Sequence, residues 1–118
     1  MSPRSWILRA QDVVKAIDSA LQIVSIQSEL EFCEDEKSVL AVMACLNIIS
    51  EAVNHIPNEV KIKYSEIKWS QIRGMRNRIS HEYFSLDNPI IYRTCTEALP
   101  VLKKQIIKIL DNQNKHEN

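Results

Sequence analysis

The sequence predicts an all-α protein, an up-and-down bundle of four or five helices. Three observations lead to this class. The 118 residues include one glycine and four prolines, so few positions interrupt a long helix. Apolar residues recur at helical spacing over long segments, and no segment shows the alternation of a strand. A chain of this length suits one domain, which we expect to span residues 1–118 with a frayed polar tail from about residue 112.

The first predicted helix runs from about Ser5 to Ser28. Its apolar residues fall at helical spacing with polar residues between them, namely Ile7, Ala10, Val14, Ile17, Leu21 and Val24. The acidic segment that follows, ELEFCEDEK, is predicted to be a short linker. Its carboxylates favour the positive N-terminal end of the next helix.

The second predicted helix, Lys37 to His55, is apolar on most of its faces. A helix of this kind must be covered on most faces, and burial by a second subunit is a natural explanation. A narrow polar stripe interrupts it at Asn47, Glu51 and Asn54. The stripe is either a partly exposed edge or a place where Glu51 pairs with an arginine across the core, because an unpaired buried carboxylate is costly.

Two shorter predictions follow. Pro57 begins a short helical turn, PNEVKIKY, and a further helix runs from about Trp69 to Phe84.

The last predicted helix contains two prolines, one in its first turn and one in its interior. Asp87 or Asn88 can cap it, with Pro89 in the first turn, where a missing N–H is harmless. We expect it to end near Asp111 and to bend or break at Pro100.

Charge is balanced over the whole chain but not along it. Lysine plus arginine and aspartate plus glutamate each total 15, so bulk basicity gives no indication of nucleic-acid binding. One segment is locally basic, with a single acid, Glu66, among Lys61, Lys63, Lys68, Arg73, Arg76 and Arg78. From charge alone, this segment is either a solvated helix face or a binding patch.

Cysteine and histidine positions predict no metal site and no cofactor. The three cysteines, Cys33, Cys45 and Cys95, form no CxxC pair and lie among apolar neighbours, which is typical of buried thiols in a reducing compartment. The N-terminus has no signal-peptide pattern, and no run approaches the ~18 apolar residues of a membrane span. We expect a cytoplasmic protein.

The segment RGMRNRISHEYF concentrates polar chemistry on one helix. At about 100° per residue, five side chains form one contiguous band: Arg73, Arg76, Asn77, Ser80 and His81. The chain's only glycine, Gly74, lies beside this band. A mid-helix glycine costs about 1 kcal/mol relative to alanine, so it is either drift at an exposed site or a point of close approach by another backbone or a ligand.

The band offers the parts for phosphoryl chemistry without metal. An arginine can hold a phosphate through two hydrogen bonds and stabilise transition-state charge. A histidine near its ordinary pKa of about 6.5 can take or give a proton. RNA carries its own nucleophile, the 2′-OH, and a two-fold dimer would supply one histidine as base and a second as acid.

The same segment, WSQIRGMRNRISHEYFSLD, resembles the signature of the HepT-like toxins of the HEPN superfamily. The family pattern is Arg, four residues, His, one residue, Tyr, which here falls on Arg76, His81 and Tyr83. The segments LRAQDVVKAID, NIISEAVNHIP and TEALPVLKKQIIKIL also follow the family's order. Two departures are Ser50, where the family often has glycine, and the missing prolines around YSEIKW.

The resemblance implies a HEPN-like bundle that forms homodimers, with Arg76 and His81 of both copies lining one cleft. It implies metal-independent RNA cleavage. From their places in the polar band and stripe, we expect Arg73, Asn77 and Ser80 to position the RNA and Glu51 to support the site. The resemblance also implies a small nucleotidyltransferase antitoxin of the MntA type that transfers AMP to Tyr83. Two alternatives stay open: a non-catalytic subunit that binds nucleotide or partner in a nucleotidyltransferase complex, and a helical dimer that serves assembly only.

Overall fold

The computed structural model describes residues 3–81 and 87–117, and every regular element in these two ranges is helical. The protein therefore has the all-α architecture that the sequence predicts. The elements in chain order are α1 (Pro3–Ser25), α2 (Glu29–Glu34), α3 (Glu36–Asn54), α4 (Asn58–Lys63), α5 (Trp69–His81), α6 (Asn88–Arg93), the π-helical turn η2 (Thr94–Ala98) and α7 (Leu99–Glu117).

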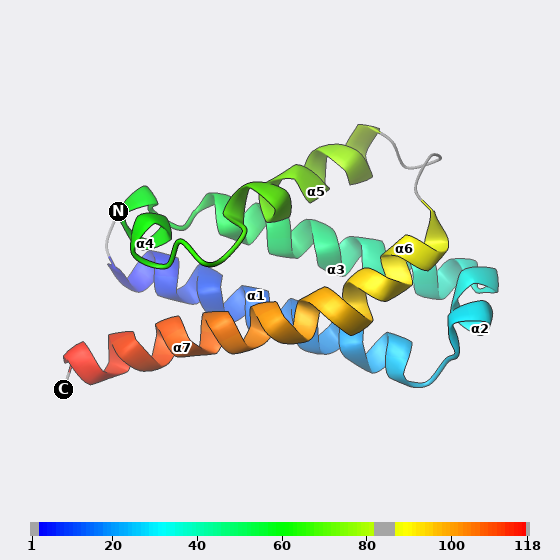
Figure 1. The fold of residues 1–118 in the computed structure, drawn as a ribbon, viewed down its shortest axis with the longest axis horizontal. Helices are drawn as coiled ribbons and strands as arrows, with labels where there is room; N and C mark the ends of the chain where they lie inside the picture. Colours follow the sequence, from blue (N-terminus) through cyan, green and yellow to red (C-terminus); the bar gives the residue numbers. More distant parts are fainter. Residues whose placement is uncertain (1–2, 82–86, 118) are drawn as a thin grey trace.

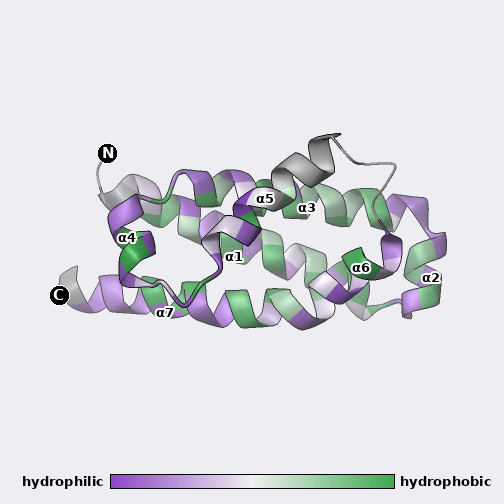
Figure 2. Cartoon of the chain, turned by 45° about the horizontal axis from the view of Figure 1, so that its top comes forward, coloured by the Kyte–Doolittle hydropathy of each residue, from purple (hydrophilic) through white to green (hydrophobic). Residues whose placement is uncertain are grey.

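The long helices form an elongated bundle of 47 × 28 × 21 Å (Figure 1). Helix α1 packs against both α3 and α7, and α5 packs on α3. The described chain begins and ends at the same end of the bundle, near α4 (Figure 1). Hydrophobic and hydrophilic positions alternate along α1 and α7, as amphipathic helices require (Figure 2).

The core lies between these helices. Its fully buried side chains come from five of the elements and include Ile17, Phe32, Ile49, Cys95 and Ile106. This one cluster joins α1, α2, α3, α6, η2 and α7, and Ile72 attaches α5 to it.

Helix α1 ends earlier than predicted, because Ser28 caps a separate helix. The Ser28 hydroxyl accepts the backbone N–H of Glu31 at 3.1 Å, and the Glu31 carboxylate accepts the N–H of Ser28 at 2.9 Å. This reciprocal capping box begins α2, so the prediction of a linker over ELEFCEDEK is wrong. Helix α2 buries Phe32, whose ring lies 5.5 Å from that of Tyr92 in α6.

The other bounds follow the sequence more closely. Asp35 caps α3 by accepting the N–H groups of Lys37 and Ser38, which places the helix start one residue from the predicted one. Pro57 precedes α4, as predicted. Helix α7 extends beyond the predicted end at Asp111 to Glu117.

Pro100 perturbs the last helix one turn before its own position. Because proline lacks an N–H and its ring crowds the carbonyl four residues earlier, a regular α-helix cannot pass through it unchanged. The chain widens into the π turn η2, where the N–H of Leu99 bonds to the carbonyl of Thr94. The predicted bend is therefore a π-helical turn between α6 and α7.

Candidate functional site

Helix α5 carries most of the predicted site on one continuous stretch of helical backbone. Its bounds, Trp69–His81, include Arg73, Arg76, Asn77, Ser80 and His81. Side-chain positions are described up to Met75 on this helix, so the placement of the side chains from Arg76 to His81 stays a prediction. Tyr83 lies outside the described residues.

The start of α5 is fixed by Trp69. Its indole Nε1 donates to two backbone carbonyls, that of Lys61 at 3.1 Å and that of Tyr64 at 3.0 Å. Both acceptors lie at the end of α4, so one side chain ties α4 to α5. Tyr64 is itself anchored, because its buried ring carries a hydroxyl that accepts a bond from Asn112 of α7. The N-terminal part of α5 is thereby held to the rest of the bundle.

Basic side chains gather where α4 meets α5. Arg73 is exposed, and Lys61 is half-buried. Burial lowers the pKa of Lys61 below its ordinary value, and the charge of Arg73 lowers it further. Lys63 extends over the Tyr64 ring, with Nζ 5.6 Å from the ring centroid. The local positive charge predicted from the sequence therefore lies around the junction of α4 and α5, where the charge of Arg73 influences Lys61.

Gly74 lies next to Arg73 and faces open space. A Cβ built on it meets no described atom within 4 Å. No close approach within this chain therefore requires the glycine. Of the readings predicted from the sequence, an exposed site and contact with another molecule remain.

Glu51 lies on the part of α3 that is only partly covered. Its Oε1 is 3.7 Å from Nε2 of His55, one helical turn later, which forms an ion pair when the imidazole is protonated. Asn47 and Asn54, the other members of the polar stripe, are exposed. The stripe is thus a partly exposed edge, and an arginine partner for Glu51 stays a prediction. The neighbouring Ser50 is fully buried, and its hydroxyl donates to the carbonyl of Asn47.

The same face of α3 exposes apolar side chains. Leu40 is 44% exposed and Ile48 is 49% exposed, and the small Ala44 lies between them at the same spacing of four residues. Residues four apart on a helix form one row. Helix α3 is therefore not covered on most faces by its own chain, and this Leu40–Ala44–Ile48 row is the part left open.

Comparison with known proteins decides the family. The family described as ribonuclease HepT-like matches residues 13–109. The chain belongs to the HepT-like family. No solved structure matches this HepT-like chain significantly.

Relatives of similar length support this membership. A candidate RNase of Methanocaldococcus jannaschii is 32% identical over 91% of this chain and 89% of its own length. A candidate RNase of Caldanaerobacter subterraneus subsp. tengcongensis is 31% identical over 95% of this chain and 97% of its own. A candidate ribonuclease HepT of Thermococcus cleftensis is 32% identical over 84% of this chain and 90% of its own.

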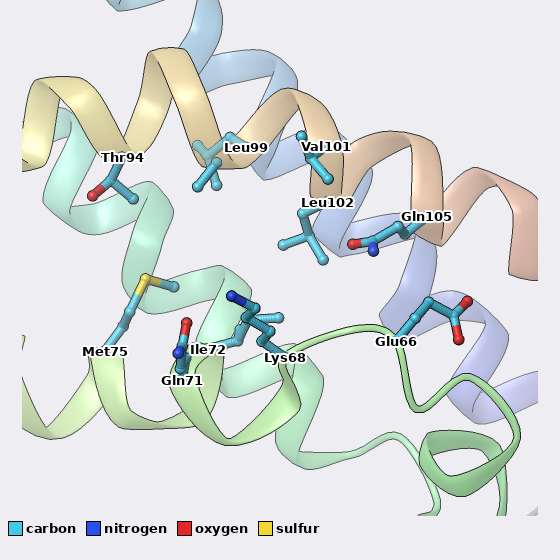
Figure 3. Close-up of a pocket in the computed structure, with 11 residues that line it drawn as sticks. Glu66, Lys68, Gln71, Ile72, Met75, Thr94, Leu99, Val101, Leu102 and Gln105 are labelled. Atoms are coloured by element: carbon cyan, nitrogen blue, oxygen red, sulfur yellow. The ribbon is translucent and has the colours of Figure 1, made fainter.

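A groove runs along a different face of α5 in this HepT-like chain. It lies between α5 and η2–α7 and has a volume of about 430 Å³ (Figure 3). Apolar side chains such as Ile72, Met75 and Leu102 line it, and Lys68 and Gln71 stand at its α5 side. Arg73 is not among its lining residues. Of the predicted polar band, the one member with a described side chain, Arg73, therefore lies outside the groove.

Three further features concern the described part of this HepT-like chain. Over residues 3–81 and 87–117, no group of three or more His, Cys, Asp or Glu side chains is placed to hold a metal ion. Cys45 and Cys95 are buried as predicted, whereas Cys33 is half-buried, and burial raises the pKa of each thiol. No described helix has the length and apolarity that crossing a membrane requires.

Sequence reasoning did not assign a role to Lys61 or to Trp69. The sequence places Lys61 in a basic segment but does not show which basic residues of that segment come close to one another in the fold. Their meeting depends on the Trp69 indole, whose two backbone acceptors lie five and eight residues away. A tryptophan after a turn of mixed polarity gives no such signal by itself.

Proposed function

We propose that this chain is the RNA-cleaving toxin subunit of a two-component system and that it acts as a homodimer. Membership of the HepT-like family over residues 13–109 carries the proposal. The pattern of Arg76, four residues, His81, one residue and Tyr83 agrees with it. Arg76 and His81 belong to the single helix α5, which turns their five-residue separation into a fixed spacing.

The proposed reaction is an internal transfer within RNA. The 2′-OH next to the scissile phosphate loses its proton to His81 of one copy and attacks phosphorus. The bond to the 5′-oxygen breaks, and His81 of the second copy gives that oxygen a proton. The products are a 2′,3′-cyclic phosphate and a free 5′-OH. No metal ion takes part in this scheme.

Arg76 holds the scissile phosphate and stabilises the charge that builds on its oxygens. Arg73, Asn77 and Ser80 position the RNA from the same helix, and Glu51 supports the site from α3. These roles follow from the family pattern and the helical spacing.

The homodimer is proposed to form through the exposed Leu40–Ala44–Ile48 row of α3. Helix α5 packs on α3, so a second copy bound at this row also comes near α5. Alanine in the middle of the row lets two helices approach closely. The proposed cleft needs this arrangement, because one chain supplies one histidine to the band.

Cleavage of RNA in the presence of EDTA tests the reaction. The wild-type protein is expected to cut single-stranded RNA and to leave cyclic phosphate ends, with a loss of about 100-fold or more in His81→Ala, as for removal of a general acid–base group. His116→Ala, at a histidine outside the motif, is the matched control and should cut normally. Equal cleavage by wild type and His81→Ala would exclude the mechanism.

Light scattering tests the dimer. Wild type should have the mass of two chains at micromolar concentration, and Ile48→Glu should have the mass of one, because a charge is placed within an apolar interface. Leu8→Glu, at a similarly exposed apolar position on α1, is the control. A monomeric wild type would remove the composite cleft.

The partner is proposed to be a small nucleotidyltransferase that transfers AMP to Tyr83 in the cytoplasm. The chain's two other tyrosines are engaged elsewhere, since the Tyr64 hydroxyl accepts from Asn112 and the Tyr92 hydroxyl donates to the carbonyl of Gln27. An AMP group adds bulk and negative charge near the phosphate-binding arginine.

Incubation of chain, partner and ATP, followed by peptide mass measurement, should locate AMP on Tyr83 and not on Tyr64 or Tyr92. Modified protein should lose RNA cleavage, and a Tyr83→Phe variant should stay active beside the partner. Modification of a chain that never cleaves RNA would instead favour a non-catalytic subunit.

A further inference from the structure

Two cations, Lys61 and Arg73, lie at the junction of α4 and α5, and no described carboxylate forms an ion pair with either. Lys61 and Arg73 are close enough for the charge of Arg73 to lower the pKa of Lys61, after the larger effect of burial. The single acid within this basic segment, Glu66, lines the groove beside α7.

A specific hydrogen bond fixes the backbone at this junction. Trp69 Nε1 bonds to the carbonyl of Lys61, so the last turn of α4 is fixed against the first turn of α5. Arg73 follows Trp69 by four residues and therefore shares its side of the helix. Lys61 and Arg73 are held near each other by the backbone, although their like charges repel.

The same row of α5 leads from this junction to the catalytic motif. Positions Trp69, Arg73, Asn77 and His81 are each four residues apart. At 1.5 Å per residue, Arg73 lies about 12 Å along the helix axis from His81. At roughly 3.4 Å per stacked nucleotide, this distance corresponds to about three or four nucleotides of one strand.

We propose that Lys61 and Arg73 form a second phosphate-binding subsite, which holds the RNA backbone a few nucleotides from the scissile phosphate. The inference rests on the proposed function for the identity of the ligand as RNA. A phosphate between the two cations removes their repulsion and supplies acceptors for both. In this subsite Lys61 is a positioning residue that acts on binding and not on the chemical step.

Binding of a short single-stranded 2′-O-methyl RNA, which has no 2′-OH to attack, measures the subsite without any cleavage. Lys61→Gln is expected to weaken binding about fivefold to tenfold and to reduce the slope of log K against log salt by about 0.7, the value for one phosphate contact in a single strand. Lys61→Arg should restore both. Lys104→Gln, which removes the same charge from an exposed position on α7, is the control and should change the slope by less than half as much.

Cleavage kinetics on ordinary RNA complete the test. Lys61→Gln should raise KM by the same factor with kcat unchanged, and its melting temperature should not fall, because a repulsive contact is removed.

Four outcomes separate the two proposals. Cleavage together with Lys61-dependent binding supports both. Binding that depends on Lys61 in a protein that does not cleave supports the subsite and overturns the function. Cleavage with Lys61→Gln indistinguishable from Lys104→Gln overturns the subsite alone, and absence of RNA binding overturns both.

Discussion

Replacement of Gly74 by alanine tests whether this glycine is required by the fold of the single chain or by close contact in the proposed assembly. Gly74 lies in the interior of α5, where glycine is about 1 kcal/mol less favourable than alanine. The added Cβ meets no described atom within 4 Å, so no steric penalty within the chain offsets the gain. The free energy of unfolding of Gly74→Ala should therefore rise by about 1 kcal/mol, or about 4 °C in melting temperature for a domain of this size.

The assay is urea or thermal unfolding at two protein concentrations. At high dilution, where single chains dominate, the variant should show the full gain. At concentrations that favour the dimer, the gain should shrink and RNA cleavage should fall. Gly74 lies on the same side of the helix as His81, two turns before it, and a second backbone there would meet the new methyl group. Ser19→Ala, at an exposed position within α1, provides a control that should gain only a few tenths of a kcal/mol at both concentrations.

Either of two results would refute this reasoning. A loss of stability in the dilute monomer would show that the space around Gly74 is filled by its own chain. An equal gain at both concentrations, with cleavage unchanged, would show that no other molecule approaches closely there.

Two further predictions concern the support of the site. Trp69→Phe removes the donor shared by the carbonyls of Lys61 and Tyr64 and should lower the free energy of unfolding by about 1–3 kcal/mol in urea titrations; no change would mean that water replaces the indole. Cys95 should make the protein unstable at high pH: burial raises its pKa from 9.0 to about 12, so above pH 9 the unfolded chain loses a proton that the folded chain keeps. The contribution of Cys95 to the free energy of unfolding is complete below pH 9 and should fall by about 1.4 kcal/mol per pH unit toward pH 12. Urea titrations at pH 8 to 10 should show a smaller decline for Cys95→Ala than for wild type.

The sequence predicted the long helices because their signals are local. The bounds of α3 differ from the prediction by one residue at each end, since its dense apolar residues and the preceding Asp35 are both adjacent in sequence. The signal for α2 was also local: Ser28 and Glu31 have the spacing of a capping box. The acidic composition of the same segment favours a linker and conflicts with this signal.

The contacts that hold the short helices were not predictable in the same way. Phe32 is buried against Tyr92, sixty positions later, and no local pattern specifies that pair. The junction of Lys61 with Arg73 likewise depends on the fold of the intervening turn. Of the candidate site, helical spacing predicted the arrangement of positions on α5, and residue chemistry suggested roles for arginine and histidine. The family resemblance then singled out Arg76, His81 and Tyr83.

The isolated chain has two energetically unfavourable surface features, one on α3 and one on α4 and α5. Each would be stabilised by a different kind of binding partner. The Leu40–Ala44–Ile48 row exposes apolar surface on α3, which another apolar surface removes from water most effectively. The Lys61–Arg73 pair leaves like charges adjacent on α4 and α5, which only an anion neutralises. The phosphates of RNA can neutralise the charges, whereas RNA cannot cover the apolar row well. Because α5 packs on α3, both ligands would meet at one helix, so the proposed dimer would place its RNA-binding surface beside its own interface.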